Sequence, residues 1–193
     1  MLNHDEARQI FVDAQALLNG HFRLTSGRHS NQYMQCAQVL KYPHYTEQLA
    51  RHLADCFLDD GVELVVGPAM GGIIVAYEVG RQLGVPAIFT EREDGVMVIR
   101  RGFNIEPGQK VLVVEDVVTT GGSVKEVIER VKAADGEVIG VGVLVDRSSG
   151  KVDFGVKTAA VLTMDIESWE PDNCPLCKEG KLEVVKPGSR TVK

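Results

Sequence analysis

The stretch that decides the fold reads Val111-Leu112-Val113-Val114-Glu115-Asp116-Val117-Val118-Thr119-Thr120-Gly121-Gly122-Ser123. Its first four residues are aliphatic and mostly β-branched, a composition typical of a strand that is buried on both faces. A short Thr/Gly-rich loop follows, and apolar residues then recur at helical spacing. Ser123 and Glu126 have the spacing of a capping box, which predicts a helix over 123–134.

The same alternation of strand and helix extends outward from this stretch. Further strands are predicted at 64–66, 87–89, 138–145 and 158–162, and further helices at 46–58 and 73–83. Strands that alternate with helices indicate an α/β fold, with a mainly parallel sheet flanked by helices. Ligands of such sheets bind beyond the carboxyl ends of the strands, which directs attention to residues 67–72, 91–102, 115–123 and 146–150.

The N-terminal region differs from this core. Asn3 and Glu6 form a plausible capping pair for a first helix that ends before Gly20, and short extended pieces follow up to residue 39. With no repeat or linker in the chain, we expect one domain over 1–193. Its parts would be an N-terminal region over 1–40, an α/β core over 41–165 and a tail over 166–193.

Composition limits the class of protein. The 193 residues are 44% hydrophobic and 25% charged, which is ordinary for one soluble globular domain. The net charge of −6 argues against a general nucleic-acid or anionic-membrane surface. No apolar run approaches the roughly 18 residues of a membrane span, the first residues are too acidic for a signal peptide, and four cysteines do not resemble a disulfide scaffold. We therefore expect a cytoplasmic protein.

The loop after the carboxylates has the chemistry of a phosphate cradle. The hydroxyls of Thr119, Thr120 and Ser123 are donors, while Gly121 and Gly122 let the backbone approach a ligand closely. The start of the following helix adds backbone N–H groups and positive potential. The alternative is an ordinary strand–turn–helix in which the serine only caps the helix.

The two carboxylates specify the ligand further. Glu115 and Asp116 would repel a bare phosphate, but they can bind neutral hydroxyls or a metal-bound group one sugar length away. The combination therefore predicts a phosphorylated sugar. Neither G-x-x-x-x-G-K-[ST] nor a helix-opening G-x-G-x-x-G is found, so the sequence favours neither a Walker-type NTPase nor a dinucleotide-binding protein.

Residues 115–123 resemble the signature of type I phosphoribosyltransferases, which bind 5-phosphoribosyl 1-diphosphate (PRPP). Other segments resemble orotate phosphoribosyltransferases in particular, in family order from residue 20 to about residue 150. These segments are Gly20-His21-Phe22-Arg23-Leu24-Thr25-Ser26-Gly27-Arg28-His29-Ser30 with Tyr33, then 67–72, 89–95 with 100–103, and Val145-Asp146-Arg147. The resemblance implies a type I phosphoribosyltransferase-like fold with an N-terminal hood.

The resemblance also implies residue roles. Glu115 and Asp116 would hold the ribose hydroxyls and assist Mg²⁺, which is held mainly through PRPP. The PRPP 5-phosphate would lie against Val117, Val118, Thr119, Thr120, Gly121, Gly122 and Ser123. The diphosphate loop would be Ala69, Met70, Gly71 and Gly72, and the hood residues would be Thr25, Ser26 and Gly27.

Cationic side chains complete this expectation. Arg92, Arg100 and Arg101 would act with Asp116 in catalysis, closing over the departing diphosphate from a mobile loop. Arginines stand in this loop where many relatives carry lysines and a histidine, and Thr25 stands where many carry a lysine. The alternative is an exposed hairpin with solvated charges.

The base would be recognised at a different strand end. Thr119 and Arg147 would bind orotate, and a planar guanidinium suits a planar anion. The alternative for Arg147 is a surface arginine that pairs with Asp146.

The implied activity is Mg²⁺-dependent transfer of phosphoribose from PRPP to orotate, which gives orotidine 5-phosphate and diphosphate in UMP biosynthesis. The family pattern implies a homodimer that shares loop cations between subunits, with no nucleic-acid or membrane partner. Two alternatives stay open: a phosphoribosyltransferase for another base, and a regulatory module that binds PRPP without catalysis.

One motif remains outside this picture. Cys174-Pro175-Leu176-Cys177 is a C-x-x-C pair in a polar tail, with no second such pair and no C-x-x-H nearby. None of the five histidines has the spacing of a metal ligand. We expect an ordinary reduced turn here, with zinc shared across a dimer and redox catalysis as the alternatives.

Overall fold

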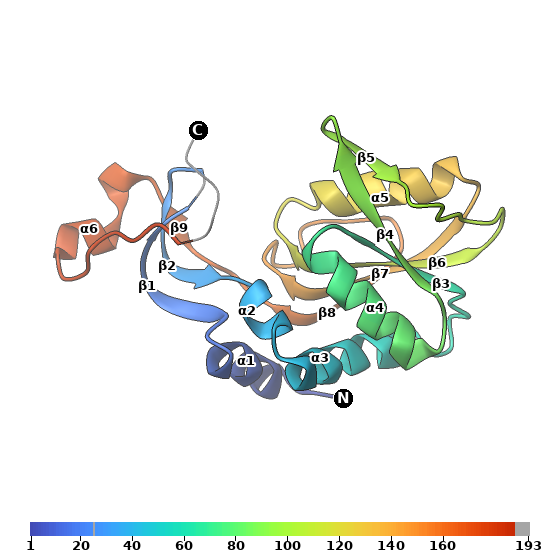
Figure 1. The fold of residues 1–193 in the computed structure, drawn as a ribbon. Coiled ribbons are helices and arrows are strands. Elements are labelled where there is room, and N and C mark those ends of the chain that lie inside the picture. Colours follow the sequence, from blue (N-terminus) through green and yellow to red (C-terminus); the bar gives the residue numbers. More distant parts are fainter. Residues whose placement is uncertain (25, 188–193) are drawn as a thin grey trace.

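The core of the fold is a six-stranded sheet in the order β5-β4-β3-β6-β7-β8 (Figure 1). The computed structural model describes residues 1–24 and 26–187. The strands are β3 (Leu64–Pro68), β4 (Ala87–Glu93), β5 (Val96–Ile99), β6 (Lys110–Val118), β7 (Glu137–Asp146) and β8 (Lys157–Thr163). All neighbouring pairs are parallel except β4 and β5, which confirms the mainly parallel α/β sheet.

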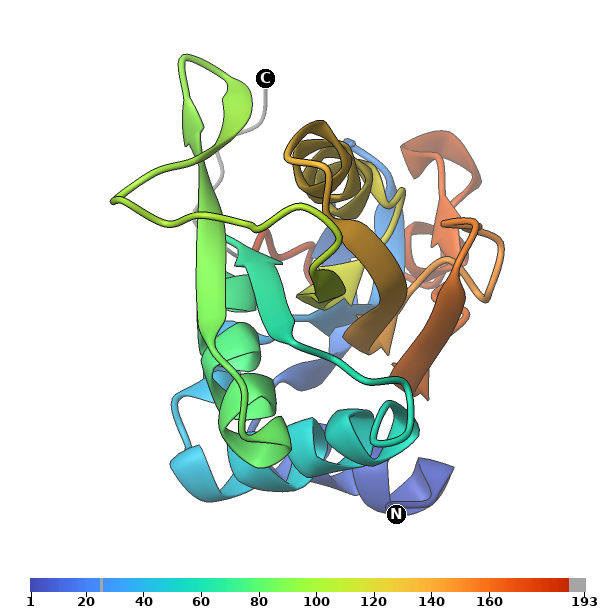
Figure 2. The same ribbon diagram turned by 90° about the vertical axis from the view of Figure 1, so that its right-hand side faces the viewer.

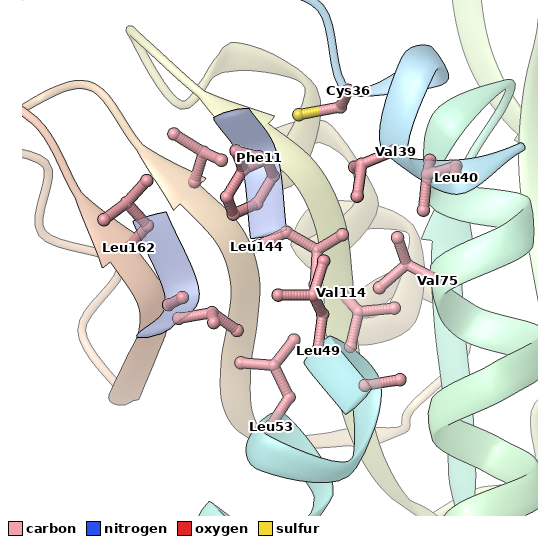
Figure 3. Packing of buried hydrophobic residues seen from close by; sticks show 14 of the residues in the cluster. Phe11, Cys36, Val39, Leu40, Leu49, Leu53, Val75, Val114, Leu144 and Leu162 are labelled. Atoms are coloured by element: carbon pink, nitrogen blue, oxygen red, sulfur yellow. The ribbon is translucent and has the colours of Figure 1, made fainter. Parts of the chain in front are cut away.

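Helices cover both faces of this sheet. They are α1 (His4–Asp13), α2 (Ala37–Leu40), α3 (Pro43–Cys56), α4 (Gly71–Leu83) and α5 (Gly122–Ala133). The first four helices contribute to one buried cluster, in which Phe11, Leu49 and Leu144 point toward one another (Figure 3). Helix α5 packs on the opposite face of the sheet, in a second cluster.

Strand β6 shows why its sequence is so uniformly apolar. Leu112 and Val114 belong to the first cluster, whereas Val111 and Val113 belong to the second. All four side chains are fully buried, because successive residues of a strand point to opposite faces and both faces are covered here. The strand continues through Glu115 and Asp116 to Val118, so both carboxylates lie within its last residues, next to the core, rather than in a loop.

A second, smaller sheet stands apart from the core. Its order is β1 (Leu17–Arg23), β2 (His29–Met34) and β9 (Ser168–Trp169), and both pairs are antiparallel. The short helices η1 (Pro171–Asn173) and α6 (Pro175–Glu179) follow β9 and lie beside it (Figure 1). We call this unit of β1, β2, β9, η1 and α6 the hood; it joins chain segments from both ends of the sequence.

The two capping patterns in the sequence have different outcomes. Asn3 and Glu6 form a complete capping box at the start of α1, as expected. The box predicted for Ser123 and Glu126 is wrong. Helix α5 begins one residue earlier because Gly121, at a φ of 75°, occupies the N-cap position in the left-handed conformation, so Ser123 lies inside the first turn.

Among the described residues, no helix has the length and apolar character that crossing a bilayer requires.

Candidate active site

A cavity of about 430 Å³ opens at the carboxyl ends of β3 and β6. It is lined by Ala69, Met70, Gly71, Glu115, Asp116, Val117, Val118, Thr119, Thr120, Gly121, Gly122, Ser123 and Val124. The sequence singled out all of these except Val124. Two predicted segments, the diphosphate loop and the PRPP loop, therefore form opposite walls of one cavity.

Glycines let these two walls approach each other. A Cβ atom on Gly71 would lie 2.1 Å from Asp116 Oδ2, and one on Gly67 would lie 2.2 Å from the carbonyl oxygen of Gly72. Neither position can hold a larger residue without moving backbone or carboxylate. The peptide bond between Ala69 and Met70, in the same loop, is cis. The close packing places the amide-rich start of α4 directly against the acidic doublet.

The acidic doublet is electrostatically unfavourable by itself. Burial, followed by the charge of Asp116, raises the pKa of Glu115 to about 9, and burial also raises the pKa of Asp116. The main chain relieves part of this cost, since the Asp116 N–H donates to Glu115 Oε1 at 3.0 Å and the Val117 N–H donates to Asp116 Oδ1 at 2.8 Å. The pair is thus suited to a cation or to hydroxyl donors from a ligand.

The loop beyond the doublet is open to solvent on the cavity side. Thr119, Thr120 and Gly122 are exposed, and Ser123 is half-buried. The N-terminal N–H groups of α5 have no side-chain cap, which leaves them available to an anion. A Cβ on Gly121 would approach Val152 Cγ1 to 2.6 Å, so both the φ angle and the packing require glycine there. An exposed loop that leads into an uncapped helix start is an arrangement that can bind an anion.

Arg147 follows β7, next to the cavity but outside its lining. Its N–H donates to the carbonyl oxygen of Val118 at 2.8 Å, while its buried Nε has no hydrogen-bond partner among the described residues. The alternative pairing with Asp146 is wrong, because that carboxylate accepts from the N–H groups of Ser148 and Gly150. Arg147 thus carries a buried guanidinium nitrogen without a partner among the described residues, beside the end of β6.

The three arginines of the predicted mobile loop lie outside the cavity. β4 continues to Glu93, beyond the predicted strand at 87–89, and pairs with β5 in a hairpin that extends past the other strands at the top of Figure 2. Arg92 pairs with Glu126, Arg100 with Glu93, and Arg101 with Glu91, at 2.6, 2.9 and 2.9 Å. None of the three arginines lines the cavity of the described chain. In this conformation the segment is an exposed hairpin, as in the alternative, but its charges are paired with carboxylates rather than solvated.

The predicted hood residues lie in the β1–β2 turn. Ser26 is exposed, and Gly27 adopts a φ of 85° while its N–H donates to the carbonyl oxygen of Leu24 at 2.9 Å. Thr25 falls outside the described residues. Neither Ser26 nor Gly27 contributes to the cavity lining.

Sequence reasoning missed two residues near the C-x-x-C pair. His21 on β1 and His29 on β2 lie against Cys174 and Cys177, although no spacing in the sequence marks either histidine as a metal ligand. The physical reason is topological: β9 pairs with β2 and carries the tail back to the hood. No local spacing signals a contact between residues 153 positions apart.

Comparison with known proteins defines the class first. The phosphoribosyl transferase domain family matches residues 36–169, which include both walls of the cavity. The chain belongs to this family of phosphoribosyltransferases. The expected type I phosphoribosyltransferase-like fold is thereby confirmed.

Full-length relatives narrow the class. The orotate phosphoribosyltransferase of Desulforamulus reducens is 61% identical over 99% of this chain and 100% of its own length. That of Heliobacterium modesticaldum is 62% identical over 98% and 100%. A solved structure, the orotate phosphoribosyltransferase of Aeropyrum pernix, superposes with a TM-score of 0.68 at 26% identity, covering 81% of this chain and 92% of the other. Within the family, the chain thus groups with the orotate phosphoribosyltransferases.

Proposed function

We propose that this chain transfers the phosphoribosyl group of PRPP to a ring nitrogen of orotate. The bond between the sugar's anomeric carbon and diphosphate breaks, a carbon–nitrogen bond forms, and orotidine 5-phosphate and diphosphate leave. The observation that carries the proposal is the cavity at the end of β6, where a buried acidic doublet leads into the uncapped start of α5. In that arrangement, carboxylates can accept hydrogen bonds from the ribose hydroxyls, and N–H groups about one sugar length away can donate hydrogen bonds to the 5-phosphate.

Each wall of the cavity has its part in binding PRPP. The loop from Val117 to Ser123 would hold the 5-phosphate through backbone N–H groups and three hydroxyls. Glu115 and Asp116 would accept hydrogen bonds from the ribose hydroxyls, which fixes the orientation of the anomeric carbon. The loop formed by Ala69, Met70, Gly71 and Gly72 would lie against the diphosphate.

The donor set also fits Mg²⁺. Carboxylate oxygens are ligands that this cation prefers, and the raised pKa values of Glu115 and Asp116 show that positive charge would be favourable there. When bound together with PRPP, the ion would supply positive charge that neutralises the diphosphate. The two carboxylates would assist it from the ribose side.

Orotate would be held beside the sugar by Arg147 and Thr119. The buried, unpartnered Nε of Arg147 supports this role, because a bidentate guanidinium bond to a carboxylate would satisfy it. Thr119 is exposed at the cavity edge, within the same loop as the phosphate cradle. The base and the sugar would thereby meet at one strand edge.

Arg92, Arg100 and Arg101 would act by moving. Exposed ion pairs of this kind are weak and can exchange, and left-handed glycines lie in the hairpin turn, at Gly95, and directly after Arg101, at Gly102. A cationic hairpin over the diphosphate would stabilise the charge that develops as it departs and would exclude water.

In a homodimer these cations would reach the partner's cavity. Exposed Ile74 and Tyr77 on α4, next to the cavity loop, offer apolar surface for such pairing. A mixture of inactive Asp116→Asn and Arg92→Ala subunits should regain activity in verified heterodimers, and no recovery would exclude sharing through Arg92. We also place the protein in the cytoplasm, in UMP biosynthesis.

The decisive experiment measures diphosphate release with PRPP, Mg²⁺ and each of orotate, uracil and hypoxanthine. Diphosphate release with orotate, but with neither uracil nor hypoxanthine, supports the proposal. Turnover with hypoxanthine instead would indicate a phosphoribosyltransferase for another base. PRPP binding by calorimetry without turnover on any base would indicate a regulatory module.

A further inference from the structure

The hood contains a cluster of two histidines and two cysteines, none of which lines the cavity at the ends of β3 and β6. Cys174 and Cys177, at the start of α6, face His21 of β1 and His29 of β2. One ligand atom from each residue lies within 4.8 Å of all the others. His21, His29 and Cys174 are buried, at 2%, 6% and 0% exposure, while Cys177 is at the surface.

Four of the six distances between these atoms are close to the edges of a coordination tetrahedron. With Zn–S of about 2.3 Å and Zn–N of about 2.0–2.1 Å, tetrahedral ligands are separated by roughly 3.3–3.8 Å. His21 Nε2 lies 3.4 Å from Cys174 Sγ and 3.6 Å from Cys177 Sγ. His29 Nδ1 lies 3.2 Å from Cys177 Sγ and 3.0 Å from His21 Nε2. A small expansion would admit a metal ion at the centre.

Hydrogen bonding orients the first histidine for this purpose. His21 Nδ1 is 3.1 Å from the carbonyl oxygen of Leu182, which can only accept a hydrogen bond. The proton of a neutral His21 ring is therefore on Nδ1, and the lone pair of Nε2 points at the other three ligands. Backbone support of the distal nitrogen is the usual arrangement for a metal-binding histidine.

The C-terminal part of the hood has little apolar core of its own. Neither η1 nor α6 has a buried residue, and β9 has only two residues. The tail is held to β1 and β2 by Arg28, which pairs with Glu170, and by backbone bonds such as Val185 N–H to the His21 carbonyl oxygen. Small units with so little apolar core are commonly stabilised by a metal or a disulfide, and both cysteines are free here.

We propose that His21 Nε2, His29 Nδ1, Cys174 Sγ and Cys177 Sγ bind one Zn²⁺ ion within a single chain. Two thiols lose their protons to solvent and two neutral imidazoles contribute lone pairs, so the site keeps no net charge. A tetrahedral S₂N₂ set favours zinc, and four protein ligands leave no position for substrate water. The site is structural: it fixes the C-terminal tail to the hood.

The test is the metal content of the full-length protein, purified under reducing conditions without an affinity tag that binds metals. We expect about one zinc per chain by atomic emission. Replacement by Co²⁺ should give the visible absorption of a tetrahedral ion, together with thiolate charge-transfer absorption in the near ultraviolet. Neither readout depends on transferase activity.

Variants identify the ligands. Cys177→Ser, at an exposed position, and His29→Gln should each weaken zinc binding by more than about 100-fold, since loss of a direct ligand exceeds the effect of an outer partner. Cys56→Ser, a half-buried cysteine outside the cluster, is the matched control and should retain the metal. Wild-type protein that binds neither zinc nor cobalt, or that holds a Cys174–Cys177 disulfide, would overturn the proposal. Full zinc content in His29→Gln would also overturn it, because the ligands would then come from elsewhere, including a second chain.

Discussion

The cavity proposed to bind PRPP and the His/Cys cluster are both polar sites, but the chain builds them in opposite ways. The cavity is lined by two short continuous segments, each at the carboxyl end of a parallel strand, so residues that are neighbours in the sequence are also neighbours in the site. The cluster comes from three elements, and His21 lies 153 positions from Cys174. Continuous sites leave a motif in the sequence, whereas assembled sites depend on how sheets pair.

The two sites also differ in their electrostatics. In the cavity, two carboxylates lie side by side; burial raises the pKa of both, and the charge of Asp116 further raises that of Glu115. In the cluster, two thiols and two imidazole rings each place one ligand atom within 4.8 Å of the others. Bound ligands would therefore relieve unfavourable electrostatics in the cavity, whereas a ligand bound in the cluster would stabilise the fold around it.

The largest effect should come from Asp116→Asn. Loss of charge-assisted hydrogen bonds to the ribose, at roughly 1.5–3 kcal/mol each, should lower kcat/KM for PRPP by about 100-fold. Steady-state kinetics at saturating orotate measures this change. Because the side chain belongs to the cavity and not to the core, Tm should stay the same or rise; a large drop in Tm would mean that the carboxylate is structural.

Arg147→Ala tests whether base recognition is separate from the phosphate cradle. Removing the guanidinium should raise the KM for orotate about 30-fold, equivalent to about 2 kcal/mol, with little change for PRPP. Arg147→Lys keeps the charge but loses the planar fork, so its KM for orotate should lie between those of the wild type and of Arg147→Ala. Equal loss for both substrates would contradict the assignment to the base.

The outcome of sequence reasoning follows the same division between local and assembled features. The alternation of strands and helices predicted the sheet, and the Glu115–Asp116 motif predicted the cavity wall, because both are encoded by neighbouring residues. The sequence could not reveal that Gly71 must be glycine to admit Asp116, since that contact joins two different strand ends. The position of His21 against Cys174 was equally hidden, because it depends on β9 pairing with β2.

Glu115→Gln should reveal the cost of the buried doublet as a pH-dependent change in stability. The folded pKa of Glu115, about 9, lies above its unfolded value of 4.5, so the unfolded chain releases its proton first. The penalty is absent below about pH 4.5, grows as pH rises between these two values and is complete above the folded pKa.

The variant removes this penalty, so its Tm should exceed that of the wild type by about 4 °C or more at pH 8 and differ little at pH 4.5. Calorimetric scans of both proteins without ligand provide the measurement. A difference that is equal at both pH values would show that packing, rather than ionisation, separates the two proteins.

The smallest effects concern the two capping patterns, which look alike in sequence but differ in structure. Asn3 accepts a hydrogen bond from the Glu6 N–H at 2.9 Å, so Asn3→Ala should cost about 1 kcal/mol and lower Tm by about 2–4 °C. Ser123 caps nothing, and Ser123→Ala should leave Tm within about 1 °C.

The effects of the two variants on activity should be in the opposite order to their effects on Tm. Asn3 is remote from the cavity and its variant should keep full activity, while loss of the Ser123 hydroxyl should raise the KM for PRPP about three- to tenfold, the equivalent of one neutral hydrogen bond. Thermal scans and PRPP titrations on the same two preparations measure both quantities. If Ser123→Ala lowers Tm as much as Asn3→Ala does, the serine stabilises α5, and its assignment to the phosphate cradle fails. If the two variants diverge as expected, a sequence pattern typical of helix capping has been used in this chain for ligand binding.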